Sequence, residues 1–429
     1  MKPNRGNVKQ GFKAKQQFAY NMLTDRRNVF LTGDAGTGKS FVIQQFIKWC
    51  NKQNLEFIVT APTGIAAINV DGVTIHRAFK APIGPIIEPL KSISGILKTV
   101  DVIIVDEISM CRRDLFEFMA AQIIYVNKMR RSKGQKDIQF VVVGDFFQLP
   151  PVLVEAEKEV LDKHYGKDVG YAFAFQSPYW RACNFVNVVL DEVVRQADTE
   201  FIKNLNDARL GRYNCISYFS EKSCKNEIKQ AILLCGTNKA VIERNNAELD
   251  KLTTKVVEYE SLSVGEVNDS DKMAPDLIKL KLGARVMTLV NDFKERYQNG
   301  SFGTVIELSE NYVLVIMDSG ETVKIEPYTW SIKGYKLVKD KETGKEKLEL
   351  TEIGSFTQIP LKLAYAITIH KSQGQTYDKV NLDPYCWDCG QLYVALSRCK
   401  TIENMHLTQL IKPRFLRASK EVINFYRSL

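Results

Sequence analysis

The sequence predicts an α/β protein in which short buried strands alternate with helices. Three observations support this prediction. Runs of β-branched residues recur between segments of helical periodicity, a glycine-rich loop joins the first run to the next helix, and a later segment contains only short runs and turns. At roughly 150 residues per domain, the 429 residues correspond to about three domains, or to two with an insertion.

The first predicted unit covers residues 1–180 and contains an open parallel sheet. Its strands are short apolar runs without charges, the pattern of strands that are buried on both faces. Helical patterns separate them, from Phe41 to Lys48 and from Leu115 to Val126. The predicted strands are Val29–Thr32, Phe57–Thr60, Val102–Val105 and Phe140–Val143.

A second α/β unit is predicted in residues 181–303 and 357–429. Between its two parts, residues 304–356 form strand-like runs separated by turn signals, such as Asp318-Ser319-Gly320 and Glu342-Thr343-Gly344-Lys345. This pattern predicts a small antiparallel β-barrel inserted into the second unit. The strands predicted for the second unit are Ala231–Cys235, Leu363–Ile367 and Val380–Leu382, and the helices are Asn238–Leu252 and Gln391–Leu396.

Composition excludes several classes of protein. With 45% hydrophobic and 25% charged residues the chain is not predominantly disordered, and no apolar stretch approaches the roughly 18 residues of a membrane span. No apolar segment follows the basic N-terminus, and nine scattered cysteines fit reduced thiols, so we expect a cytoplasmic protein. Cys386 and Cys389 form one C-x-x-C without a second ligand pair, which does not predict zinc.

The net charge is 59 − 50 = +9. A basic excess of this size suits a polyanionic partner such as nucleic acid, although many proteins carry it for solubility alone.

Residues 33–40 satisfy the pattern G-x-x-x-x-G-K-[ST] between a predicted strand and a predicted helix. The glycines allow successive backbone N–H groups to face phosphate oxygens, and the helix N-terminus favours negative charge. Lys39 is expected between the β- and γ-phosphates, and Ser40 on Mg²⁺. The remaining residues expected to bind ATP here are Gly33, Ala35, Gly36, Thr37 and Gly38.

Two acidic residues follow the apolar strand Val102–Val105. Asp106 is expected to hold Mg²⁺, and Glu107 to act as general base on the attacking water. Gln148 follows the next strand, and its uncharged amide suits orienting that water or sensing the γ-phosphate. A plain loop ended by Pro150 and Pro151 is the alternative interpretation of this last segment.

Taken in order, these motifs resemble those of superfamily-one DNA helicases, specifically the petite-integration-frequency (PIF) helicases that move five-prime to three-prime. The resemblance runs from about residue 16 to about residue 400 and suggests a minimal, bacterial or phage-type member. Besides the phosphate loop, the segments that resemble the family are Ala61–Gly64, Asp106–Met110, Gly144–Pro151, Leu190–Gln196, Phe201–Gly211, Ala364–Thr376 and Tyr393–Arg398.

The resemblance implies two RecA-like P-loop NTPase domains with ATP between them, and the β-barrel inserted at residues 304–356 is expected to be SH3-like. Residues 69–85 are rich in Gly and Pro and could form a small wedge at which the duplex splits, with a plain surface loop as the alternative interpretation. The resemblance assigns Arg195 and Arg398 to the γ-phosphate, because a guanidinium stabilises transition-state charge when the cleft closes. It assigns Gln16 to the adenine, with Gln10 and Gln17 as competitors. The resemblance adds Gly374 and Gln375 to the nucleotide site.

Single-stranded DNA binding requires phosphate contacts and surfaces on which bases stack. The resemblance places such contacts in both domains. Phe147 is the candidate for an exposed stacking aromatic, whereas Phe79 is as consistent with the core. The residues expected to bind nucleic acid are Pro62, Thr63, Gly64, His76, Phe147, Asn238, Lys239, Thr368, His370, Lys371 and Ser372.

We therefore expect an ATP-dependent DNA helicase that moves 5′–3′ on single-stranded DNA and unwinds tailed or forked duplexes in replication, repair, recombination or telomere-type maintenance. G-quadruplexes and RNA–DNA hybrids are further candidate substrates. The expected cofactors are ATP and Mg²⁺, and the expected state is a monomer near the nucleoid, with no membrane partner. The alternatives are a RecD-like subunit of an exonuclease complex and a DNA-stimulated ATPase that remodels protein–DNA complexes without unwinding.

Overall fold

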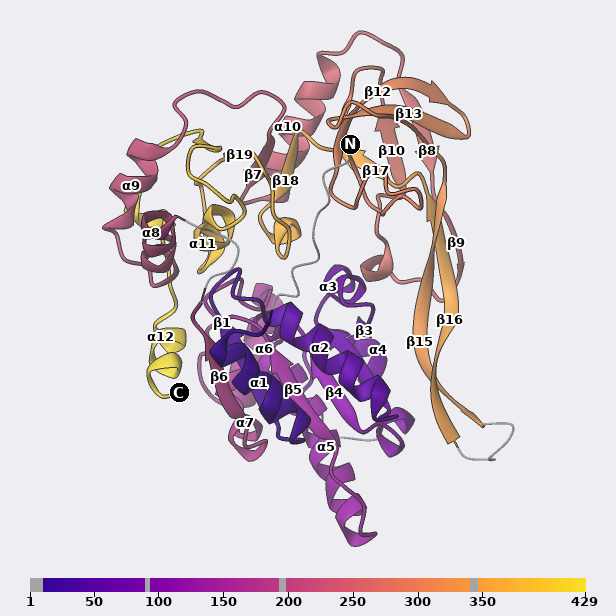
Figure 1. Cartoon of the computed structure of the whole chain (residues 1–429), viewed down its shortest axis with the longest axis vertical. Coiled ribbons are helices and arrows are strands. Elements are labelled where there is room, and N and C mark those ends of the chain that lie inside the picture. Colours follow the sequence, from indigo (N-terminus) through magenta and orange to yellow (C-terminus); the bar gives the residue numbers. More distant parts are fainter. Residues whose placement is uncertain (1–10, 89–92, 193–197, 340–345) are drawn as a thin grey trace.

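The computed structural model describes residues 11–88, 93–192, 198–339 and 346–429. Two α/β lobes lie one above the other in Figure 1, and a region of β-strands flanks both of them. The lower lobe is built on a parallel six-stranded sheet of order β3-β2-β4-β5-β1-β6. Its strands are β1 (Val29–Gly33), β2 (Phe57–Ala61), β3 (Val73–Thr74), β4 (Val102–Val105), β5 (Gln139–Val143) and β6 (Val186–Leu190).

Helices cover both faces of this sheet, which is why its central strands are mostly apolar. Every residue of β1, β4 and β5 is buried. The four strands predicted in this lobe are confirmed to within one residue, whereas β3 and β6 were not predicted. The helices are α1 (Ala14–Thr24), α2 (Lys39–Lys52), α3 (Gly64–Asn69), α4 (Ile75–Phe79), α5 (Arg113–Ser132), α6 (Glu155–Tyr165) and α7 (Pro178–Ala182).

The upper lobe contains a parallel four-stranded sheet of order β18-β7-β19-β20. Its strands are β7 (Ile232–Cys235), β18 (Ala366–Thr368), β19 (Val380–Leu382) and β20 (Met405–Leu407), and its helices are α8 (Thr199–Arg209), α9 (Cys215–Lys222), α10 (Asn238–Asp250) and α11 (Gln391–Leu396). The predicted single strand Leu363–Ile367 is wrong. Leu361–Leu363 forms β17, which pairs with β11 (Arg285–Thr288) in another sheet, because a continuous apolar run hides the change of sheet.

The C-terminal helix α12 (Lys420–Arg427) returns to the lower lobe, although residues 357–429 were predicted in the second unit. Val422 is buried in the core of the lower lobe. The ring of Phe425 stacks on that of Phe175 with centroids 4.2 Å apart. The short amphipathic helix therefore closes one side of the first sheet.

The β-strands of the flanking region begin at Val257, well before the predicted start at residue 304. Polar flanks and alternating burial, as in Leu277–Leu280, weaken the strand signal of these early segments. Tyr259 and Ile278 share one core with Val313 and Phe356, so residues 304–356 have no separate core. The strands are β8 (Val257–Glu260), β9 (Leu262–Gly265), β10 (Leu277–Leu280), β11, β12 (Phe302–Ser309), β13 (Tyr312–Met317), β14 (Thr322–Ile325), β15 (Tyr328–Lys339), β16 (Glu346–Gln358) and β17.

The sheet of order β14-β13-β12-β11-β17 is antiparallel, and a separate long hairpin of β15 and β16 runs down beside the lower lobe (Figure 1). The predicted turn Asp318-Ser319-Gly320 joins β13 to β14, with a positive φ of 88° at Gly320. The other predicted turn, residues 342–345, lies outside the described residues.

Two ion pairs hold the flanking β region to the lower lobe. Arg77 Nη2 lies 2.9 Å from Asp271 Oδ2, and Lys333 Nζ lies 3.0 Å from Asp71 Oδ1. The predicted wedge, residues 69–85, thus contains β3 and α4, and Phe79 of α4 is buried in the core. Beyond α4, Ile83 is 92% exposed.

Candidate nucleotide and DNA site

The phosphate loop wraps around the ammonium group of Lys39. Lys39 Nζ donates hydrogen bonds to the backbone oxygens of Gly33 (2.8 Å) and Asp34 (3.0 Å). Gly33 has φ +140°, and a Cβ there would lie 2.1 Å from the carbonyl oxygen of Leu190 on β6, so only glycine fits. Burial lowers the pKa of the Lys39 amine.

A cavity of about 300 Å³ opens from this loop toward the upper lobe. Every residue that lines it was predicted to bind or hydrolyse the nucleotide. The lining residues are Ala35, Gly36, Gly38, Lys39, Ser40, Glu107 and Gln148 from the lower lobe, and Gly374 and Arg398 from the upper lobe. The tertiary structure therefore brings five separate chain segments to one site.

The acidic pair stands at the carboxyl end of β4. Glu107 has φ +50°, a left-handed conformation that is uncommon outside glycine and concentrates at functional sites. Asp106 Oδ1 accepts a hydrogen bond from the backbone N–H of Glu107 (2.9 Å). Burial, with the neighbouring Asp106 charge second, raises the pKa of Glu107 to about 7. Burial also raises the pKa of Asp106.

Gln373 is a site residue that the sequence analysis did not single out. Its Nε2 donates to Glu107 Oε2 (3.0 Å) and approaches Gln148 Oε1 (3.4 Å). The signal was present, since Gln373 lies inside the Ala364–Thr376 segment, but nothing in a linear motif indicates which carboxylate an amide contacts.

Arg398 reaches the cavity from the end of α11. Its guanidinium is buried, and it donates to the backbone oxygens of Val394 (2.8 Å), Ser372 (3.2 Å) and Gln375 (3.0 Å). These bonds fix a side chain that lines the same cavity as Glu107. The other predicted arginine, Arg195, lies outside the described residues.

Arg209, at the end of α8, joins the two lobes beside the phosphate loop. Its Nε and Nη2 donate to Asp145 (3.1 and 2.9 Å), and its Nη1 lies 3.1 Å from Asp34 Oδ1. The guanidinium carbon also lies 4.1 Å from the ring centroid of Phe147. Phe147 is consequently only 4% exposed, and the prediction that it is an exposed stacking aromatic is wrong.

Gln16 lies against the phosphate loop. Its Nε2 donates to the Thr37 carbonyl (2.9 Å), and its Oε1 accepts from the Lys13 N–H (3.0 Å). Gln17 is exposed and bonds Asn21, and Gln10 lies outside the described residues. Of the adenine candidates Gln16 and Gln17, which the structure describes, Gln16 is the one that contacts the phosphate loop. Both polar atoms of its side-chain amide bond to backbone groups. The remaining nucleotide candidate, Gln375, accepts a hydrogen bond from the hydroxyl of Tyr377.

The predicted DNA contacts of the lower lobe follow β2. Pro62, Thr63 and Gly64 connect β2 to α3, and Thr63 Oγ1 accepts from the Ala66 N–H (3.2 Å). His76 lies on α4, half-buried, and burial lowers the pKa of its imidazole. Pro62, Thr63 and His76 are partly accessible, as a phosphate contact requires, whereas Gly64 is buried.

In the upper lobe, the predicted DNA contacts follow two neighbouring parallel strands. Asn238 and Lys239 open α10 after β7, while Thr368 ends β18 and the 3₁₀ turn η5 (His370–Ser372) follows it. Lys239 and Lys371 are exposed. Ser372 is fully buried, and its hydroxyl donates to the Ile369 carbonyl (2.7 Å), so its side chain does not reach a DNA phosphate in this structure.

Lys362 on β17 is a further cation that the sequence analysis missed. It is partly buried, and burial, with the Lys371 charge second, lowers the pKa of its amine to about 7. The positive charges of Lys362 and Lys371 therefore lie close enough to disfavour one another.

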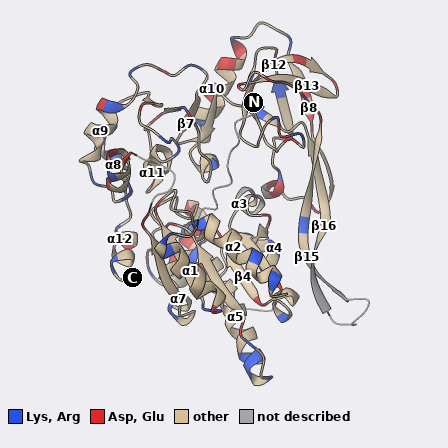
Figure 2. Cartoon of the chain, viewed as in Figure 1, with Lys and Arg blue, Asp and Glu red and all other residues tan. Residues whose placement is uncertain are grey.

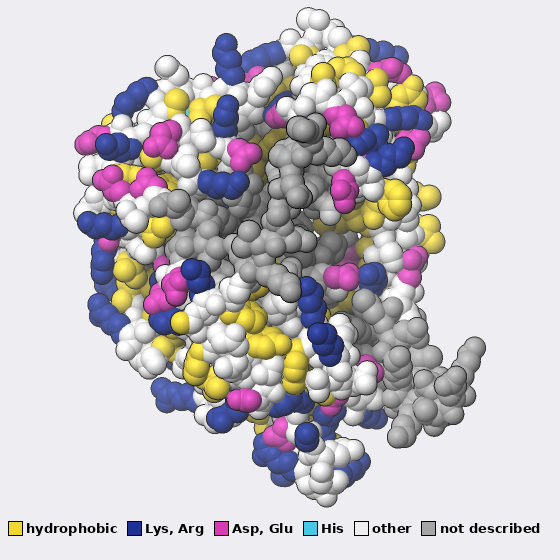
Figure 3. Space-filling view, viewed as in Figure 1, with side chains coloured by type: hydrophobic (Ala, Val, Ile, Leu, Met, Phe, Trp, Pro, Cys, Tyr) yellow, Lys and Arg dark blue, Asp and Glu magenta, His cyan; other side chains and the backbone are white. Residues whose placement is uncertain are grey.

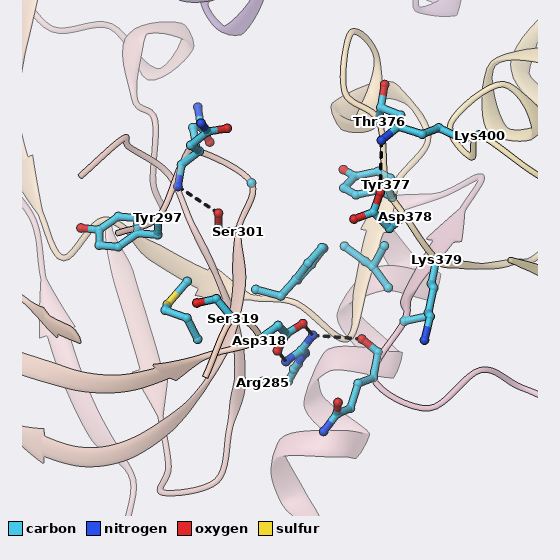
Figure 4. A pocket seen from close by; sticks show the side chains of 18 of the residues that line it. Arg285, Tyr297, Ser301, Asp318, Ser319, Thr376, Tyr377, Asp378, Lys379 and Lys400 are labelled. Atoms are coloured by element: carbon cyan, nitrogen blue, oxygen red, sulfur yellow. Dashed lines mark hydrogen bonds and ion pairs between the residues drawn. The ribbon is translucent and has the colours of Figure 1, made fainter. Parts of the chain in front are cut away.

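A larger cavity of about 690 Å³ lies between the flanking β region and the upper lobe (Figure 4). No phosphate-loop residue lines it, and its Arg285 pairs with Asp318 at 2.5 Å. Lys and Arg residues are mixed with Asp and Glu along the chain (Figure 2) and on the face shown in Figure 3. Neither size nor charge alone therefore marks the nucleotide site, which is identified by its chemistry.

The part of the chain that the structure describes contains no group of three or more His, Cys, Asp or Glu side chains arranged to hold a metal ion. No described helix has both the length and the apolar composition needed to cross a membrane.

Comparisons with known proteins agree on one family. The family model described as "PIF1-like helicase" matches residues 12–216. The ATP-dependent DNA helicase Pif1 of Campylobacter jejuni is 32% identical, over 93% of this chain and 94% of that protein.

Two solved structures of Pif1 from a Bacteroides species cover almost the whole chain. The unliganded protein has a TM-score of 0.80 at 34% identity, covering 97% of both chains. The same helicase bound to single-stranded DNA has a TM-score of 0.68 at 35% identity, covering 97% of this chain and 96% of that one.

Proposed function

Because the chain belongs to the PIF1-like helicase family and is an ATP-dependent DNA helicase with two RecA-like domains, we propose that it moves 5′–3′ along single-stranded DNA and unwinds duplex ahead of it. The observation that carries this proposal is the cavity that Lys39 and Glu107 share with Arg398 of the other lobe. A site divided between two lobes couples hydrolysis to their relative movement.

Four of the residues that line the cavity have proposed chemical tasks in ATP hydrolysis. Lys39 neutralises the β- and γ-phosphates, and Glu107 takes a proton from the attacking water that Gln148 orients. Arg398 stabilises the charge that develops on the transferred phosphoryl group. Gln16 contacts the phosphate loop through the Thr37 carbonyl and is proposed to support adenine binding. The backbone oxygen of Gln375 accepts a hydrogen bond from Arg398, and Gln375 is proposed to support phosphate binding.

The residues proposed to hold Mg²⁺ fit that ion. Ser40 and Asp106 supply only oxygen ligands, as Mg²⁺ prefers, and stand at the start of α2 and the end of β4. When bound, the ion neutralises phosphate charge and helps to orient the γ-phosphate. The base Glu107 and Arg398 line the same cavity without the ion.

The DNA path runs along the carboxyl ends of β2, β7 and β18. Lys239, Lys371 and Lys362 are its proposed phosphate contacts in the upper lobe, and Thr63 with His76 in the lower lobe. The relative fits better without DNA (TM-score 0.80) than with single-stranded DNA (0.68), which supports a DNA-free arrangement for this structure. We expect the lobes and the β region to rearrange on DNA binding.

We also propose that the two RecA-like domains correspond approximately to the two lobes. Residues 257–363 then form an insertion in the second domain. A monomer near the nucleoid, acting on tailed and forked duplexes, is the proposed working state.

A strand-separation assay tests the proposal. The substrates are matched duplexes with a 5′ tail, a 3′ tail or no tail, and Lys39→Ala is the inactive control. Unwinding of the 5′-tailed duplex alone, dependent on ATP and Mg²⁺, is the expected result. DNA-stimulated ATP hydrolysis without strand separation would instead support a remodelling ATPase, and preference for the 3′ tail would reverse the polarity.

A further inference from the structure

One amide from the upper lobe contacts both residues that are proposed to hold the attacking water. Gln373 Nε2 lies 3.0 Å from Glu107 Oε2 and 3.4 Å from Gln148 Oε1. Glu107 and Gln148 belong to different segments of the lower lobe, and Gln373 follows η5 of the upper lobe. The three side chains therefore meet only because the lobes are in contact.

The position of this nitrogen is informative. A water molecule that attacks the γ-phosphate must donate to the base Glu107 and lie within hydrogen-bond reach of the orienting amide Gln148. The Gln373 nitrogen satisfies both conditions, and a second heavy atom does not fit at the same point. The amide thus competes with the attacking water for these two acceptors.

We propose that Gln373 is an inhibitory positioning residue, which excludes the attacking water while DNA is absent and withdraws from Glu107 and Gln148 when DNA is bound. The inference rests on the proposed function, since it assumes ATP hydrolysis with Glu107 as base. It extends that function by naming the contact through which DNA stimulates hydrolysis.

The contact is built to be released. Gln373 Oε1 is buried and has no hydrogen-bond partner among the described residues. A buried unpaired oxygen is unfavourable by an amount comparable to the gain from one hydrogen bond. When the amide leaves the site it loses the hydrogen bond to Glu107, but its oxygen becomes hydrated. The net free-energy cost of the movement is therefore small, and binding energy from another site can supply it.

DNA binding can supply that force because Gln373 is tied to the DNA segment. Its backbone N–H donates to the His370 carbonyl (3.2 Å), and the exposed Lys371 lies two residues before it. On either side, Arg398 holds the carbonyls of Ser372 and Gln375. A phosphate that draws η5 toward the DNA path thus moves Gln373 with it, while the Arg398 guanidinium stays attached to the same segment.

The test compares steady-state ATP hydrolysis by the full-length wild type and Gln373→Ala, with and without a single-stranded oligonucleotide. Without DNA, we expect kcat of the variant to rise about three- to tenfold, the factor corresponding to one hydrogen bond, with KM for ATP unchanged. With DNA, the two proteins should have similar kcat, so the stimulation ratio falls. A loss of packing alone would not raise kcat selectively in the DNA-free protein.

Two further variants sharpen the result. Gln373→Asn keeps the amide but shortens it by one methylene, and we expect it to behave like Gln373→Ala. Gln409→Ala is the matched control, because Gln409 is an exposed glutamine that donates to the carboxylate of Asp383 (2.8 Å) away from the cavity, and it should leave both rates unchanged.

An unchanged or reduced DNA-free kcat in Gln373→Ala would overturn the inference, since the amide would then be neutral or would help to place the water. If the wild type itself hydrolyses no ATP, the proposed function fails instead. A wild type that DNA stimulates normally, beside a variant without elevated basal turnover, rejects only the inference.

Discussion

The guanidinium of Arg209 forms a two-point hydrogen bond with the carboxylate of Asp145, although the residues are 64 positions apart and lie in different lobes. The same guanidinium reaches Asp34 of the phosphate loop. Arg209 therefore links the phosphate loop, the Asp145 segment and α8, and it should contribute to the stability of the fold.

Replacing Arg209 with alanine leaves Asp34 and Asp145 without their shared cation. We expect a loss of about 3–5 kcal/mol of unfolding free energy, as for other buried pairs that lose one partner. Arg209→Lys keeps the charge but not the fork geometry, so its loss should be smaller. Urea denaturation followed by circular dichroism measures both, and equal stability of Arg209→Ala and wild type would contradict the assignment.

The raised pKa of Glu107 predicts how the turnover number depends on pH. The folded pKa of Glu107 is raised to about 7, and the base works only when ionised. As pH falls below about 7 the carboxylate is protonated, so DNA-stimulated kcat should fall about tenfold per pH unit there and level off above pH 8. Glu107→Gln should bind ATP yet remain nearly inactive at every pH. Substantial turnover by that variant would remove Glu107 from the role of base.

Arg398→Lys preserves a positive charge but cannot reproduce the bonds to Val394, Ser372 and Gln375. We expect DNA-stimulated kcat to fall by about 10²-fold, the usual effect of removing a transition-state donor, with little change in ATP affinity. Stopped-flow nucleotide binding and steady-state turnover separate the two effects. A weakened ATP affinity with normal kcat would instead assign Arg398 to ground-state binding.

The β15–β16 hairpin offers a test of the inserted region. Excising all of residues 304–356 would remove strands that share a core with Tyr259 and Ile278, so that variant should not fold. Replacing only residues 333–352 by a short Gly/Ser turn keeps the paired base of the hairpin. We expect the shorter variant to retain DNA-stimulated ATPase activity but to unwind a 5′-tailed duplex more slowly.

The control for the hairpin variant is Lys333→Ala, which removes only the exposed ion pair to Asp71 and should have a small effect. Full unwinding by the shortened variant would show that the hairpin is dispensable. Loss of both activities in a folded protein would make it part of the motor.

The sequence by itself determined the phosphate loop, the acidic pair and the central strands of the first sheet. These features depend on neighbours along the chain: glycines that permit positive φ, a strand that delivers the loop and a helix that starts at Lys39. Apolar runs buried on both faces also indicate parallel strands without further information. The nine predicted residues around the cavity therefore needed only the fold to bring them together.

Only the tertiary structure decided the contacts between distant segments. Phe147 is covered by Arg209, α12 closes the first sheet, the flanking strands begin at Val257, and Gln373 meets Glu107 from the other lobe. A linear pattern does not show which surfaces meet, because each of these features depends on the packing of segments that are far apart in the sequence. Which side chains are buried and which residues contact one another is decided when those surfaces pack, and the order of residues along the chain does not show it.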